Sequence, residues 1–131
     1  MKKDIEIPIV KEVYVAVVQE WNEEFLSKDW NAYIINDRET PIDMVLIVSK
    51  GYDGAVKTSK MRHGIGKVEG KSFAKIELMQ EDVLQINNEF YVTFFADDKL
   101  YEKKYIFRKN TINENAMQIL PVMQVDGVLV K

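Results

Sequence analysis

The segment from Glu89 to Lys109 constrains the fold more than any other part of the chain. It reads EFYVTFFADDKLYEKKYIFRK, two alternating runs on either side of Asp97 and Asp98. A period of two places successive side chains on opposite faces of a strand. Two such runs around a short polar pair are typical of a hairpin. The segment therefore predicts two antiparallel strands joined by a tight turn.

Further β-branched and aromatic runs predict strands at 13–19, 30–36, 44–49 and 72–79. About seven short strands with a turn near every ten residues predict an all-β fold, an antiparallel immunoglobulin-like β-sandwich. A small partly open β-barrel is the alternative, because both closures use similar strands. We expect one domain over residues 1–131. The predicted core residues are Val15, Val17, Trp30, Ala32, Ile34, Leu46, Val48, Phe73, Ile76, Val92, Phe94 and Ile106.

The last part of the chain carries helix and turn signals. Thr111 and Glu114 form a capping-box pattern, and the following apolar residues recur at helical spacing until Pro121. We therefore expect one short C-terminal helix. Beyond it, Asp126-Gly127 suggests a small hairpin or an arm on a sheet edge. Residues 19–30 are compatible with a helical turn or with a bulged strand extension, and the sequence leaves both open.

Composition excludes several kinds of site. The chain has no cysteine and a single histidine, which excludes disulfides, thiolate ligands and a multi-histidine zinc site within one chain. We expect no metal and no cofactor. The start, MKKDIEIPIV, lacks the continuous apolar stretch of a signal peptide, and no apolar run reaches the ~20 residues of a membrane span. We expect a soluble, cytoplasmic protein without membrane contact.

Two basic segments interrupt an acidic chain. Residues 57–71 carry five cations and one anion, as do residues 99–109, whereas the whole chain has a net charge of −3. Lysines on exposed edge strands discourage pairing with other chains, and this is the interpretation that we favour. The alternative is an anion-binding surface for nucleic acid, phosphate or an acidic partner. Its candidate binding residues are Lys57, Lys60, Arg62, His63, Lys67, Lys104 and Arg108, with Trp21 as an exposed contact.

The glycines at 64, 66 and 70 resemble a phosphate loop only superficially. Such a loop leads into a helix, whose first N–H groups face the anion. Here the strand-like SFAKIEL follows instead. We therefore predict a turn or a bulge between strands.

No catalytic constellation is apparent. His63 would need a nucleophile and a carboxylate to converge on it. The acidic pairs Glu23-Glu24, Glu81-Asp82 and Asp97-Asp98 are adjacent in sequence, so in a strand their members point to opposite faces. We expect no enzymatic activity and assign no catalytic residue. Trp30, followed by AYII, is predicted to be buried, whereas Trp21 lies in an acidic segment.

Several phrases carry a family resemblance over nearly the whole chain: WNAYIIND, MVLIVSKGYDG, KTSKMRH, KSFAKIE and EFYVTFFADDKLYEKKYIFRKNTINE. They resemble a small bacterial family whose members often carry the label phenylalanyl-tRNA synthetase alpha subunit. A class II synthetase site needs arginine-bearing strands for ATP, and GIGKVEGK lacks that arginine. The resemblance therefore implies a stand-alone domain, carries over no catalytic residues and does not lead us to expect aminoacyl-tRNA ligase activity.

Taken with the strand pattern, the lack of a catalytic constellation predicts a non-catalytic interaction or structural module. Its partner would be another protein or a second copy, through edge pairing or a sheet face. The alternative is binding of RNA or tRNA through the two basic segments.

Overall fold

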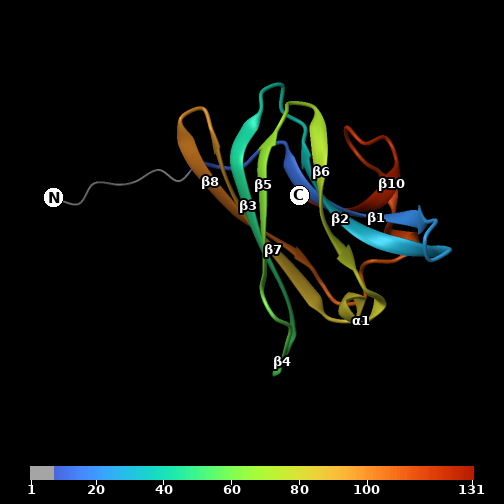
Figure 1. Cartoon of the computed structure of the whole chain (residues 1–131). Coiled ribbons are helices and arrows are strands. Elements are labelled where there is room, and N and C mark those ends of the chain that lie inside the picture. Colours follow the sequence, from blue (N-terminus) through green and yellow to red (C-terminus); the bar gives the residue numbers. More distant parts are fainter. Residues whose placement is uncertain (1–7) are drawn as a thin grey trace.

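Two antiparallel sheets face each other in the structure, a computed structural model that describes residues 8–131 (Figure 1). Sheet A contains, in spatial order, β6 (Ser72–Met79), β2 (Ser27–Asn36), β1 (Val13–Asn22), β10 (Asp126–Val130) and β9 (Gln118–Ile119). In sheet B, the central strand β3 (Ile42–Asp53) pairs on one side with β4 (Val56–Lys57) and β5 (Met61–Val68). On its other side β3 pairs with β7 (Asn87–Ala96), which forms a hairpin with β8 (Lys99–Phe107). One helical turn, α1 (Glu81–Leu84), links β6 to β7.

The predicted antiparallel β fold is confirmed. The sheets remain two separate layers, so the barrel alternative is wrong. The hairpin predicted at 89–109 is β7 and β8, with both turn residues at positive φ. The structure has more strands than the seven predicted, because β4 and β9 are only two residues long and β5 was not recognised as a strand.

Side chains from both sheets form the main core. Val15, Val17, Ala32 and Ile34 of sheet A are fully buried, as predicted, with Val92 of sheet B. Trp30, Ile76 and Phe94 are buried too. The Tyr105 hydroxyl donates a hydrogen bond to the Val13 carbonyl at 2.5 Å, which links β8 to β1 inside the core. Buried polar groups of this kind need such partners.

A bulge in β3 corrects two core predictions. The pairing of β3 shifts register between Ile42 and Leu46, and Met44 has a φ of 50°. The extra residue brings Val45 and Ile47 to the inside. Leu46 is therefore 43% exposed on the outer face, and Val48 is half-buried there. Phe73 is also exposed and Ile106 half-buried, because each lies on the outer side of its strand.

A second apolar cluster covers the outer face of sheet A. Leu120 and its neighbours Val122 and Met123, in the loop between β9 and β10, pack over Ala16, Val18, Tyr33 and Ile35. Leu120 is only 2% exposed. The chain thus covers part of one outer sheet face with its own C-terminal loop.

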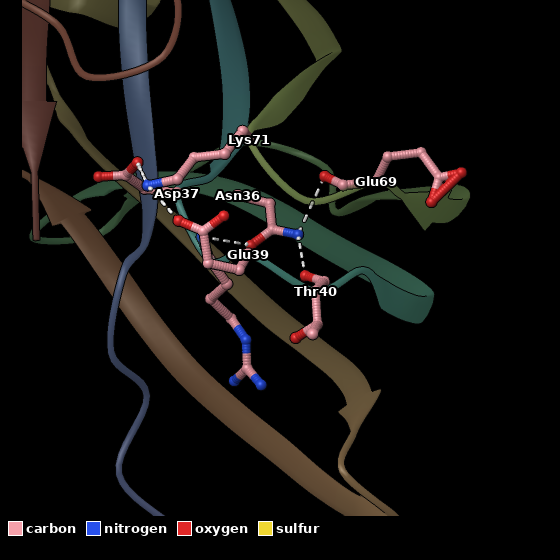
Figure 2. Close-up of polar contacts among 7 residues, drawn as sticks. Asn36, Asp37, Glu39, Thr40, Glu69 and Lys71 are labelled. Carbon is pink, nitrogen blue, oxygen red and sulfur yellow. Dashed lines mark hydrogen bonds and ion pairs between the residues drawn. The ribbon is translucent and has the colours of Figure 1, made fainter.

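A buried amide joins the loops at one end of the sandwich. The Asn36 Nδ2 lies 3.0 Å from the Thr40 carbonyl and 3.0 Å from that of Glu69, as Figure 2 shows, and 3.2 Å from that of Val68. Beside it, the Lys71 Nζ contacts the Asp37 carboxylate at 2.8 Å. This network fastens the β2–β3 loop to the β5–β6 turn.

Close packing explains the glycine in that turn. A Cβ atom on Gly70 would lie 2.3 Å from the Glu39 carbonyl oxygen, a distance that real Cβ atoms do not show. Gly66 has a φ of 83° and lies where β5 pairs irregularly with β3. The prediction of a turn or bulge is confirmed for Gly70 and Gly66, whereas Gly64 lies within β5 and pairs with Leu46.

The predicted C-terminal helix is wrong. Only Glu114–Ala116 form a 3₁₀ turn, and Asn113, not Thr111, caps it by accepting a hydrogen bond from the Ala116 N–H. The Thr111 hydroxyl instead donates to the Arg108 carbonyl at 2.6 Å. Residues 118 and 119 then extend as β9, because pairing with β10 satisfies their backbone.

The structure also defines the two segments for which the sequence left alternatives. Asp126-Gly127 is not a turn: it pairs with β9 inside β10. A Cβ atom on Gly127 would lie 2.9 Å from the Val17 carbonyl oxygen, so the site requires glycine. Residues 19–30 are neither a helical turn nor a bulged extension, because β1 and β2 pair regularly up to Asn22 and Ser27 and close in a short turn.

Candidate functional site

The two basic segments lie on opposite edges of sheet B. Among residues 8–131, β5 pairs only with β3, and β8 pairs only with β7. Both strands are therefore edge strands, the position that the edge-strand interpretation predicts for them, and the role of their lysines in discouraging pairing stays a prediction. The segments do not merge into one basic patch, since β3 and β7 lie between them.

One row of the sheet nevertheless connects them. Arg62 pairs with Val48, Val48 with Tyr91, and Tyr91 with Lys104. Directly paired residues point to the same face, and three strand spacings separate the outer two Cα atoms by about 14 Å. Arg62 and Lys104 thus border a shared outer surface from opposite edges.

That surface, which we call the open face, is the outer side of β3, β7 and β8. Its apolar and aromatic side chains are Leu46, Val48, Tyr91, Phe95, Leu100 and Ile106. Leu46 is 43% exposed, Phe95 42% and Leu100 51%. In the described part of the chain, no loop covers them as the 120–125 loop covers sheet A. Neighbouring exposed apolar side chains of this kind mark interaction surfaces.

The acidic side chains that flank the centre of the open face already have partners within the chain. The Tyr91 hydroxyl donates a hydrogen bond to Glu102, which raises the pKa of the phenol. Glu89 lies 3.7 Å from the Lys50 ammonium. Arg62 and Lys104 have no ion pair among residues 8–131. The row through Tyr91 therefore presents positive charge at both of its ends.

The His63 side chain points toward the space between the sheets and already has a hydrogen-bond partner. Its Nε2 lies 2.8 Å from the Glu77 Oε1, and the Ser49 hydroxyl donates to the same oxygen at 2.5 Å. The side chains of His63 and Glu77 are only 17% and 16% exposed. The serine thus bonds to the carboxylate and not to the imidazole, which is not the arrangement of a serine nucleophile with a histidine base. The trio connects β3 and β5 to β6 of the other sheet.

Lys57 and Lys60 border a small hollow with Lys50. It measures about 370 Å³, and residues of β3 and β4 line it. The Gly51 N–H is not available to an anion, because it donates to the Thr58 hydroxyl at 2.7 Å. Glu89 also lines the hollow. The three ammonium groups attract anions without a backbone cradle, so a specific phosphate site lacks its usual donors.

The remaining candidate residues lie apart from these. Lys67 is exposed and pairs with Glu69 at 3.6 Å, an arrangement of little energetic weight. Arg108 is exposed just after β8. Trp21 is 57% exposed near the tip of the β1–β2 hairpin, and Trp30 is buried, as predicted.

A wider hollow of about 950 Å³ lies beside residues 8–11 and the start of β8. Its guanidinium, that of Arg38, is held by Asp97 at 2.5 Å, and this hydrogen bond raises the pKa of the arginine. The Arg38 guanidinium is thus already paired, and the other two cations of the lining, Lys11 and Lys99, are exposed. The size of the hollow therefore does not mark it as a reaction site.

Sequence reasoning missed a polar hollow on sheet A. Asn31 and Tyr33 both donate hydrogen bonds to Glu20 there, although the three residues come from two strands and carry no recognisable motif. The only available signal was the polar Asn31 between apolar neighbours in WNAYII. Such an isolated residue in a buried strand can mark a hydrogen-bonded site.

Residues 8–131 contain no cluster of three or more histidine or acidic side chains placed to hold a metal ion. No helix in the same range has the length and apolar character that crossing a membrane requires. No protein-family model, no curated protein and no solved structure matches the chain. The resemblance to the family labelled phenylalanyl-tRNA synthetase alpha subunit therefore stays a prediction.

Proposed function

We propose that this chain is a non-catalytic protein-interaction module that binds its partner through the open face. The observation that carries the proposal is the contrast between the two outer faces. Sheet A is covered in part by Leu120 and its neighbours, whereas Leu46, Phe95 and Leu100 of sheet B remain exposed. Burial of such side chains is the main favourable term in most protein association.

Charge defines the chemistry of the partner. Arg62 and Lys104 lie at the two ends of the row through Tyr91, while Glu89 and Glu102 already have partners in this chain. A complementary surface has an apolar centre with carboxylates on both sides. Asp43, which pairs with Phe95, adds one acid at the far end of the face, where a cation of the partner would fit. A second copy of this chain would instead offer the same unpaired cations.

We also propose that the sandwich is immunoglobulin-like and that the protein is cytoplasmic. Two facing antiparallel sheets that present one face to a partner support the former. The absence of cysteine supports the latter, because the fold needs no disulfide and suits a reducing compartment.

Binding of RNA or tRNA is the second candidate. The specific observation in its favour is the row in which Tyr91 lies between Arg62 and Lys104, since aromatic rings between cations suit stacked bases. The bond from the Tyr91 hydroxyl to Glu102 places an anion beside the ring, which weakens this candidate. Nucleic-acid binding would fall steeply with salt.

A peptide selection tests the proposal. A display library is selected against the wild-type protein, and the selected peptides are measured against Leu46→Ser and Phe95→Ser. We expect sequences that combine apolar residues with Asp or Glu, and a loss of affinity of about tenfold or more in either variant, because these side chains would occupy the centre of the interface. Arg62→Ala and Lys104→Ala should weaken binding mainly at low salt.

Ser59→Ala serves as the matched surface control, because Ser59 is exposed and lies outside the open face. Selected peptides that bind Leu46→Ser and Phe95→Ser as tightly as the wild type would contradict the proposal. If light scattering shows that the wild type is a dimer and that Leu46→Ser is a monomer, the partner at the open face is a second copy of this chain and not an acidic protein. A salt-sensitive complex with tRNA that is lost in Arg62→Ala would favour the second candidate.

A further inference from the structure

The outer side of sheet A has a second feature, separate from the open face. A hollow of about 370 Å³ lies between the β1–β2 hairpin and β6. We call it the acidic hollow. Its polar lining consists of Glu20, Asn22, Glu23, Asp29, Asn31, Tyr33 and Lys75, with Trp21 and Leu78 completing the wall. Glu20 pairs directly with Asp29, so these two carboxylates lie on the same face of the sheet.

Glu20 organises the floor. Its Oε1 accepts a hydrogen bond from the Asn31 Nδ2 at 2.8 Å and another from the Tyr33 hydroxyl at 2.6 Å. Burial, and then this bond to Glu20, raises the pKa of Tyr33, so the phenol stays a donor at any ordinary pH. Both side chains are nearly buried, Asn31 being 6% exposed. Their donors are thus consumed within the site.

The amide oxygen of Asn31 is left without a partner. Because its nitrogen must face Glu20, the orientation of the amide is fixed. The Oδ1 is buried and has no hydrogen-bond donor in the described part of the chain. A buried acceptor in this state is unusual and costly, and a donor from a ligand would satisfy it.

Asp29 uses the remaining donors of the hairpin. Its carboxylate accepts hydrogen bonds from the Asn22 Nδ2 at 2.8 Å and from the Ser27 hydroxyl at 3.2 Å. The Glu20 Oε2, the Glu23 carboxylate and the Asn31 Oδ1 remain as acceptors. Lys75 is the one cation of the lining, and it makes no ion pair within 4.0 Å among residues 8–131. The hollow therefore has an excess of acceptors and of negative charge.

We propose that the acidic hollow binds an organic cation with several N–H donors, a primary ammonium or a guanidinium group. An anion would be repelled by three carboxylates, and a neutral polyol would need donors that the lining has already used. The described residues offer no cluster of metal-binding side chains. The remaining acceptors suit a cation with several N–H groups, and such charge-assisted hydrogen bonds are the strong ones.

Two sources can supply this chemistry: a lysine or arginine side chain of a protein, or a free polyamine. The site lies on sheet A and is independent of the open face on sheet B. Either proposal can therefore fail without the other.

A titration followed by ¹H–¹⁵N spectra tests the inference with the full chain. The probes are Nα-acetyl-lysine N-methylamide, the corresponding arginine compound, spermidine, and the norleucine compound as a neutral isostere. We expect saturable shifts confined to β1, β2 and β6 around Asn31 with the cations and none with norleucine. Tighter binding of spermidine would identify a free polyamine as the source, and tighter binding of a blocked amino acid a protein side chain.

Two glutamate-to-glutamine variants, which change the charge of the protein equally, provide the control. Glu23 lines the hollow and its neighbour Glu24 does not, although both are exposed. Glu23→Gln should weaken binding about threefold or more, and Glu24→Gln should leave it unchanged, because only the former removes a nearby acceptor. Glu20→Gln should abolish binding, with its spectrum reporting whether the fold persists. Lys75→Met should tighten it by removing a competing cation.

Three results would overturn the inference. They are the absence of saturation at millimolar probe, equal shifts with the norleucine compound, and equal losses in Glu23→Gln and Glu24→Gln. The last would mean that the acidic surface attracts cations without a site. Weaker binding in Lys75→Met would also contradict the inference, since it would make Lys75 a ligand rather than a competitor.

Discussion

His63 and Glu77 connect the two sheets. The imidazole comes from β5 of sheet B and the carboxylate from β6 of sheet A, and their atoms lie 2.8 Å apart. Ser49 of β3 donates to the same carboxylate oxygen. The sandwich lacks a disulfide between its layers, and this polar junction joins β6 to β3 and β5, with which β6 shares no backbone ladder.

Glu77→Ala should destabilise the fold by about 2 kcal/mol, because it leaves Ser49 and His63 without their common partner in a partly buried site. Glu69→Ala is the matched control, since its pair with Lys67 is exposed and contributes about 0.5 kcal/mol or less. Urea unfolding measures both. Equal losses in the two variants would show that the junction is no stronger than a surface pair.

Adjacent residues of β3 should respond in opposite ways. Ile47 is fully buried and Leu46 is 43% exposed. Ile47→Ala should cost about 3 kcal/mol through the cavity that it leaves, whereas Leu46→Ala should cost less than about 1 kcal/mol. Thermal or urea unfolding of the two variants tests the bulge at Met44, because an unbulged strand would exchange their roles.

Asn36→Ala should cost about 3 kcal/mol, because the carbonyls of Thr40, Val68 and Glu69 would lose a shared buried donor. Asn115→Ala is the control, an exposed asparagine in the 3₁₀ turn. Hydrogen exchange should in addition show faster opening at the β2–β3 loop in the Asn36 variant. An unchanged midpoint would mean that the loops are held by other contacts.

Alkaline pH should destabilise the fold through Tyr105. Burial, and then the charge of nearby Tyr14, raises the pKa of its phenol above the ordinary value of 10.0. The unfolded chain loses the proton above pH 10 while the folded chain keeps it. Stability is therefore full below pH 10 and falls above it, by up to about 1.4 kcal/mol per pH unit.

Tyr105→Phe checks this sign. Near pH 7 the variant should be about 1 kcal/mol less stable than the wild type, because the hydrogen bond to Val13 is lost. The difference should shrink as pH rises from 10 to 11, since the variant lacks the titrating group. Urea midpoints across this range provide the measurement. A constant difference would show that the phenol ionises normally in the folded protein.

Much of the fold could be predicted from local patterns. Alternation located β7 and β8, and runs of β-branched and aromatic residues located most of β1, β2 and β6. The contrast between Trp21 and Trp30 followed from their neighbours in sequence. Lysines on both edges of sheet B followed from the general need to protect exposed strands.

The errors came from tertiary contacts that override local signals. The bulge at Met44 inverted the facing of Leu46 and Val48, and no residue type there announces a positive φ. Pairing between β9 and β10 removed the helix that Thr111 and Glu114 suggested. The acidic hollow could not be predicted, because Glu20 and Asn31 meet only through the register of β1 and β2.

The position of β10 in sheet A has a consequence for biosynthesis. Val15 pairs with Val130, so one side of β1 gains its neighbour only when nearly the whole described chain is available. A nascent chain on the ribosome would hold β1 and β2 together with an unprotected edge until that moment. Newly made protein should thus pass through an interval in which chaperone binding competes with closure, and truncation before β10 should give an aggregating product rather than a smaller stable domain.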